Sequence, residues 1–97
     1  MREFMMLMHN DSVSESTPEM WTSYLSFLRD QRAFEGGSSI GAGEAFRGQG
    51  SPGNVSQHLT GYIRVRAESL TEAKELLAGN PVFECGGTVE IRELPRN

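Results

Sequence analysis

Two histidines are the residues of this chain whose type most readily supports acid–base chemistry. His58 lies directly before a segment with a strand-like pattern, and His9 ends another such segment. Imidazole is the side chain best matched to proton transfer near neutral pH. His58 and His9 are therefore the catalytic candidates if the protein is an enzyme. The simpler alternative is that both are solvent-exposed loop residues.

The sequence offers little support for a metal or another cofactor. A metal site needs at least three converging ligands, and adding Asp11 to His9 and His58 completes no recognised spacing motif. Cys85 is the single cysteine, so the chain has neither an internal disulfide nor a cysteine–histidine zinc framework. We expect no metal, no cofactor and an inert thiol at Cys85.

A polar strand face supplies the candidates for ligand binding. Residues 62–66 and 88–94 alternate between polar and apolar side chains, which is typical of half-buried strands. The polar side chains of these two strands are Tyr62, Arg64, Arg66, Glu90 and Arg92. If this face is enclosed, it makes a pocket for a small anionic ligand such as a carboxylate. Ion pairs between subunits and simple exposure to water are the alternatives.

The segment between these strands has the signals of a helix at both ends. Ser69 and Glu72 form a capping box, and an apolar stripe of Leu70, Ala73, Leu76 and Leu77 follows at helical spacing. Gly79 and the Asn80-Pro81 pair then end the helix.

The first third of the chain predicts another strand and another helix. Residues 4–8 are continuously apolar, which indicates a strand covered on both faces. Thr17 and Pro18 open a helix that we expect to run to about Phe34 and to bury a wide stripe including Trp21. One face of the strand would then pack on helices and the other on a second subunit.

A glycine-rich segment separates the two halves. Residues 36–53 hold seven of the eleven glycines. A phosphate cradle would use such glycines, but the segment matches no nucleotide-binding motif. We expect a bulged strand over 38–46 and a mobile loop over 47–55. The resulting order is strand, helix, strand, strand, helix, strand, which predicts a ferredoxin-like α+β fold with an antiparallel sheet.

Size and charge narrow the partners. The 97 residues suit one domain spanning 1–97, and a net charge of −4 argues against nucleic-acid binding. The sequence has neither an apolar run long enough to span a membrane nor an export signal, so we expect no membrane association and a cytoplasmic location.

The chain resembles the YCII-related family, in particular its YciI-like and Asp-Gly-Pro-Phe (DGPF) branch. The residues that carry the resemblance are Phe4 to Met8, Gly36-Gly37, Leu59 to Ile63, Ser69 to Ala73, Asn80-Pro81 and Gly87 to Arg92. The resemblance implies a bacterial protein of the dimeric α+β barrel superfamily. In that superfamily two ferredoxin-like subunits pack their sheets face to face as a homodimer and enclose a cleft.

The resemblance also implies that the family's acid–base residues are missing here. A gap-free alignment places Trp21 at the position of the family's helix histidine, and Gln49-Gly50-Ser51-Pro52 at the motif that should contain an aspartate. An indole offers stacking and one hydrogen-bond donor, so Trp21 joins the ligand-binding candidates. We therefore expect a ligand-binding or accessory module. The alternative is a small-molecule enzyme of the proton-transfer or lyase and isomerase type, using His58, His9 or Tyr62.

Overall fold

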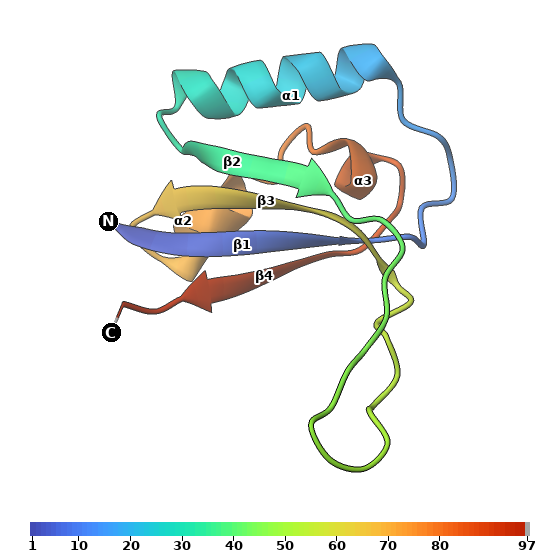
Figure 1. Ribbon diagram of the computed structural model, residues 1–97. Coiled ribbons are helices and arrows are strands. Elements are labelled where there is room, and N and C mark those ends of the chain that lie inside the picture. Colours follow the sequence, from blue (N-terminus) through green and yellow to red (C-terminus); the bar gives the residue numbers. More distant parts are fainter. Residues whose placement is uncertain (97) are drawn as a thin grey trace.

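The computed structural model describes residues 1–96. Its elements are β1 (Arg2–His9), α1 (Pro18–Asp30), β2 (Phe34–Ser39), β3 (Leu59–Ala67), α2 (Leu70–Glu75), α3 (Pro81–Glu84) and β4 (Val89–Leu94). Within residues 1–96 the strands form one antiparallel sheet in the order β2-β3-β1-β4, and both termini lie at the same end of it (Figure 1). This is the βαββαβ arrangement, so the predicted ferredoxin-like fold is confirmed.

The sheet has one face packed on helices and one face without helices. Phe4, Met6 and Met8 of β1 are buried on the helix face. Their cross-strand partners Val65 and Ile63 are buried with them, because paired residues of neighbouring strands point to the same side. Tyr24 and Leu28 of α1 complete this core.

The opposite side of the sheet, which we call the open face, carries the polar residues expected there. Its members include Glu3, Met5, Leu7, Tyr62, Arg64, Arg66, Glu90 and Arg92. Leu7 lies between Tyr62 and Glu90, and Met5 lies in the next row between two arginines. The predicted polar strand face is therefore one continuous surface with two apolar side chains at its centre.

Helix α1 begins as predicted but ends earlier. Thr17 Oγ1 accepts a hydrogen bond from Met20 N at 3.2 Å, and Pro18 is the first helical residue. The helix ends at Asp30 rather than near Phe34 because Arg32 adopts a left-handed conformation with φ of 57°. A glycine usually occupies such a position, so this helix end could not be predicted from the residue types.

Strand β2 also differs from the prediction, because it covers 34–39 rather than 38–46. Gly36 has φ of 107°, and the pairing register with β3 shifts between Phe34 and Gly37. The expected glycine bulge is therefore present in this second strand, but the strand begins four residues earlier than predicted. A Cβ at Gly37 would lie 2.5 Å from the backbone oxygen of Tyr62, so this close pairing requires glycine.

Residues 41–57, which we call the arm, are neither helix nor strand and extend away from the sheet (Figure 1). The prediction of a loop over 47–55 is confirmed. The side chain of Phe46 in the arm is highly exposed, with a relative accessibility of 85%. The arm joins β2 to β3 and brings the chain back to the sheet at His58.

Two short helices, α2 and α3, connect β3 to β4. Ser69 Oγ accepts from Glu72 N at 3.1 Å as the capping signal predicted, but α2 ends at Glu75 and Leu70 is 55% exposed rather than buried. Helix α3 was not predicted, because Asn80 and Pro81 both stop α2 and cap a new helix. No helix within residues 1–96 is long and apolar enough to cross a membrane.

Candidate functional site

An open pocket of about 740 Å³ lies where β1 ends and β3 begins, below the first turns of α1. We call it the strand-end pocket. It is lined by Met8, His9, Asn10, Ser12, Ser14, Glu15, Ser16, Trp21, Leu25, Phe34, Gly37, Ser38, Ser39, Thr60, Gly61, Tyr62, Ile63 and Val82. Its volume lies in the range of about 300–1,000 Å³ that is typical of small-molecule sites.

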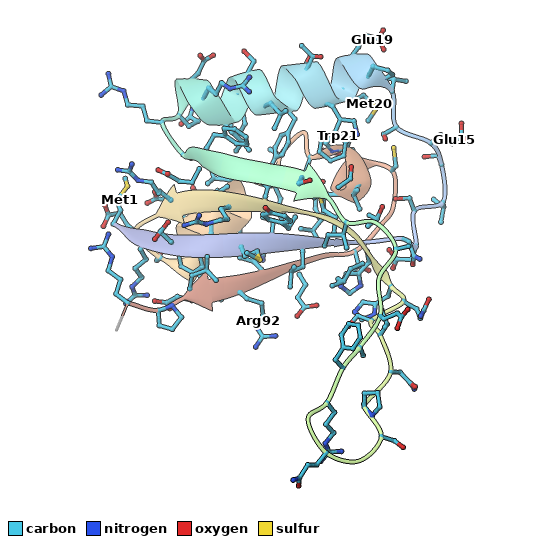
Figure 2. The ribbon with its side chains drawn as sticks, in the orientation of Figure 1. Met1, Glu15, Glu19, Met20, Trp21 and Arg92 are labelled. Atoms are coloured by element: carbon cyan, nitrogen blue, oxygen red, sulfur yellow. The ribbon has the colours of Figure 1, made fainter. Side chains whose placement is uncertain are left out.

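One wall of this pocket is aromatic and apolar. Trp21 lies on the side of α1 turned toward the sheet, whereas Glu19 points away from it (Figure 2). The indole Nε1 donates to Ser16 Oγ at 3.2 Å, which fixes the ring against the loop that precedes the helix. Leu25 follows one turn later and Phe34 lies at the start of β2. The pocket thus presents a flat ring beside aliphatic surface.

The sheet side of the pocket supplies hydrogen-bonding groups. Ser38, Ser39 and Thr60 come from the end of β2 and the start of β3 that pairs with it. Ser39 is paired with Gly61, on the same side of the sheet as buried Met8, whereas Ser38 is paired with Tyr62, whose phenol belongs to the open face. Hydroxyl groups both donate and accept hydrogen bonds, so this wall suits ligand oxygens in either role.

The loop of residues 10–17 forms a third wall and is held in place by hydrogen bonds to the start of β4. The Asp11 carboxylate accepts from Thr88 N at 2.8 Å and from Thr88 Oγ1 at 2.7 Å. Both hydrogen bonds lower the pKa of Asp11 below its ordinary value, and the one from the Thr88 hydroxyl has the larger effect. Val13 N also donates to Cys85 O at 2.9 Å, so the wall is anchored at two points.

Three chemistry-bearing side chains meet at the edge of the pocket. His9 Nε2 and Glu90 Oε1 are 3.1 Å apart, and the rings of His9 and His58 contact each other edge to face with centroids 4.7 Å apart. The His9 side chain is only 20% exposed, whereas His58 is exposed. Both predicted catalytic histidines therefore come together, joined by a residue that we had placed among the ligand-binding candidates.

Glu90 is the negatively charged member of this group. Its Oε2 accepts from Arg92 Nη1 at 3.1 Å while Oε1 faces His9. The hydrogen bond with His9, followed by that with Arg92, lowers the pKa of Glu90. Glu90 is accordingly an oriented carboxylate that holds the His9 ring in one position.

The arginines of the open face do not enter the pocket. Arg64 pairs with Glu3 at 2.7 Å and Arg66 with Glu35 at 2.8 Å, both within the chain. Among residues 1–96, no arginine or lysine lines the strand-end pocket. Arg64 and Arg66 of the open face thus form intrachain ion pairs, and a pocket for an anionic ligand between two such faces stays a prediction.

Sequence reasoning found part of this site and missed the rest. Of the named candidates, His9, Trp21 and Tyr62 line the pocket, and His58 and Glu90 stand beside His9. The missed lining residues include the serines of the 10–17 loop and of β2. Nothing in their pattern signalled a site, because isolated serines are common in loops and only the fold brings these two segments together.

One of three comparisons with known proteins found a match, and it concerns the fold. No family model matches the chain, and no curated protein matches it. A solved structure from Burkholderia phenoliruptrix AC1100, a 5-chloro-2-hydroxyhydroquinone dehydrochlorinase in complex with 2,5-dihydroxybenzoquinone, resembles it with a TM-score of 0.55 and 12% identity. The match covers 98% of this chain and 95% of that one. At this identity the likeness supports the α+β fold, and membership of the YCII-related family stays a prediction.

Proposed function

We propose that this protein binds a small, flat, oxygen-bearing ring compound in the strand-end pocket. The observation that carries the proposal is that one cavity is lined by an aromatic residue, Trp21, and by hydroxyl-bearing residues, among them Ser39 and the serines of the 10–17 loop. A ring ligand would stack on the indole while its oxygens exchange hydrogen bonds with the hydroxyls. The absence of arginine and lysine among the described lining residues favours an uncharged ligand.

The solved neighbour supplies a reasonable first probe. That protein is a dehydrochlorinase crystallised with 2,5-dihydroxybenzoquinone, a flat ring with four oxygens. Because the likeness between the two chains is one of fold, we use this compound as a test ligand and not as the assigned substrate. Hydroquinone, which is uncharged, and benzoate, which carries one negative charge, complete the panel with two substituted benzene rings.

The test uses the single tryptophan as a reporter. Titration with the panel should change Trp21 fluorescence and raise the melting temperature, more for the uncharged hydroquinone than for benzoate. Trp21→Ala should weaken the apparent affinity, measured from the rise in melting temperature, at least about tenfold, which is ~1.4 kcal/mol of binding free energy. Phe46→Ala, which alters an exposed arm residue, is the control and should bind normally.

The proposal fails if no ring compound of the panel shifts either signal. It also fails if Phe46→Ala weakens binding as much as Trp21→Ala does. In that case the ligand would be contacting the arm instead of the pocket.

A second candidate function, a small-molecule enzyme, is favoured by the contact between His9 and Glu90 beside the pocket. With Nε2 engaged by the carboxylate, Nδ1 is the nitrogen left for a bound ligand. A positioned base of this kind contributes about 10²–10⁴-fold to a rate. His9→Ala should therefore abolish most turnover of any ring compound that the wild type converts, and absence of turnover across such compounds would remove this candidate.

We also infer that two copies of the chain pack through the open face. Met5 and Leu7 at its centre are half-buried by neighbouring side chains, with no further layer over them among residues 1–96. A chain of about 100 residues buries only about two-thirds of its unfolded surface, so covering this patch would add stability. The cytoplasmic location expected from the sequence likewise stays a prediction.

A further inference from the structure

We propose that His9, His58 and Glu90 bind one divalent transition-metal ion at the edge of the strand-end pocket. These residues include both histidines of the chain, and they come from β1, from the residue before β3, and from β4. One ligand atom from each lies within 4.8 Å of the other two. The proposal goes beyond the ring-binding function and does not depend on which ligand the pocket takes.

The best-placed pair already has the spacing of two metal ligands. Zinc–nitrogen and zinc–oxygen bonds are about 2.0–2.2 Å long, so neighbouring ligands at tetrahedral or octahedral angles lie about 2.8–3.6 Å apart. His9 Nε2 and Glu90 Oε1 are 3.1 Å apart, which fits without movement of the backbone. The same distance serves as a hydrogen bond between the two groups, so a metal ion at Nε2 would take the place of the proton there, and the neutral imidazole would carry its proton on Nδ1.

The third ligand can close the site by turning its side chain. His58 is exposed, so its ring has room to rotate. Its backbone is fixed, because Asn10 N donates to His58 O at 2.8 Å, directly beside His9. Rotation about the side-chain bonds of one surface residue is therefore the adjustment that completes a three-ligand site.

The supporting groups resemble those of metal sites in general. Metal-binding carboxylates are themselves hydrogen-bonded, and Arg92 holds the second oxygen of Glu90. The Arg92 charge opposes a cation, but that side chain is 68% exposed and therefore screened by water. His9 N donates to Thr88 O at 3.0 Å, which fixes the first ligand on the paired strands.

The donor set indicates the class of metal. Two imidazoles and one carboxylate suit zinc or another first-row transition ion, whereas magnesium and calcium prefer oxygen ligands. Three protein ligands leave positions open, and His9 lines the pocket, so a ring oxygen of a bound ligand would lie near the ion. Metal binding and proton transfer are alternative uses of His9.

The experiment measures zinc and cobalt binding to tag-free, chelator-treated protein. Calorimetry should give one zinc ion per chain, and cobalt should produce the visible absorption of a site with imidazole ligands. His58→Ala, His9→Gln and Glu90→Gln should each weaken zinc binding by at least about tenfold, since even supporting residues cost 10–100-fold. Glu93→Gln on the same strand, whose carboxylate instead lies near Arg2, is the matched control and should bind as the wild type does.

A second readout keeps the test independent of variant folding. In the wild-type protein, zinc should shift the NMR signals of both imidazole rings, which are unambiguous because the chain has two histidines. The proposal is overturned if neither ion binds at micromolar concentration, or if His58→Ala and Glu90→Gln bind zinc unchanged. Trp21→Ala should keep full zinc affinity, so failure of the ring-binding proposal would leave this result intact.

Discussion

Tyr24 is the residue on which the core of this small domain most depends. Its side chain is 2% exposed, and its hydroxyl donates to Leu76 O at 2.7 Å and contacts Met6 Sδ at 3.4 Å. It therefore joins α1 to the end of α2 and to the centre of the sheet. A buried hydroxyl must be hydrogen-bonded to be tolerated, and here its partner is a helix-terminal carbonyl.

Removing that hydroxyl should cost measurable stability. We expect Tyr24→Phe to lower the free energy of unfolding by about 1–2 kcal/mol, because the Leu76 carbonyl loses its buried donor. Urea denaturation measures the change. Tyr62→Phe, which alters a half-buried phenol on the open face, is the control and should stay within about 0.5 kcal/mol. Equal losses in the two variants would contradict this account of Tyr24.

Burial of Tyr24 also predicts an alkaline instability. Removal from water raises the pKa of its phenol from 10.0 to about 12. A group whose pKa is higher in the folded state stabilises the fold fully below pH 10, and that contribution is lost as the pH rises toward 12. Unfolding free energies between pH 9 and 12 should therefore fall more steeply for the wild type than for Tyr24→Phe, and parallel curves would refute the assignment.

Residue types alone identified part of the candidate site. His9 and His58 were marked by their position at strand ends, and their convergence follows from the pairing of β1 with β3. Glu90 could not be assigned to them, because its sequence pattern shows only that it lies on a polar strand face. Its distance from His9 along the chain is 81 residues, and contacts of that range depend on sheet order.

At the scale of elements, helix beginnings were predictable and helix ends were not. Thr17 and Ser69 cap their helices through side chains that are visible in the sequence. The end of α1 depends on Arg32 in a left-handed conformation, for which arginine gives no signal. Because α1 ends at Asp30, β2 can begin at Phe34 and not at residue 38. The one missed turn therefore accounts for the wrong end of α1 and the wrong start of β2.

The loop that walls the pocket should be sensitive to one glycine. A Cβ at Gly87 would lie 2.6 Å from Ser12 Oγ, 2.6 Å from Val82 Cγ1 and 3.0 Å from Val82 O. Gly87→Ala should therefore push this loop outward, cost about 1–3 kcal/mol of stability and weaken ring binding. Thermal unfolding and the fluorescence titration measure both effects. Gly43→Ala in the arm, where nothing lies within 4 Å, is the control, and equal behaviour of the two variants would argue against a tightly packed loop.

At the scale of the whole molecule, we propose that the open face packs against a second copy of the chain. Leu7 lies at the centre of that face between Tyr62 and Glu90. Leu7→Arg should convert a dimer into a monomer by light scattering at micromolar concentration, because a charge would replace apolar surface at the centre of the contact. Leu70→Arg is the control, since Leu70 is already exposed on α2. A wild-type protein that is monomeric at this concentration would disprove the assembly.

Fold and site are linked at this scale. The sheet order places the end of β1 beside the start of β3, and α1 closes over them, so that Trp21, His9 and the serines of β2 line one cavity. The order of elements, apart from the short helix α3, could be predicted from the sequence. The cavity was not, because it depends on where the 10–17 loop rests against β4.

The most direct test of the central claim is an NMR titration that follows the indole Nε1–H signal of Trp21 and the backbone amides. With hydroquinone or 2,5-dihydroxybenzoquinone, we predict shifts for Trp21, for residues 38–39 and 60–62, and for the 10–17 loop, with the arm unchanged. Shifts confined to the arm or spread evenly over the surface, with the Trp21 signal unmoved, would contradict a ligand site between α1 and the sheet.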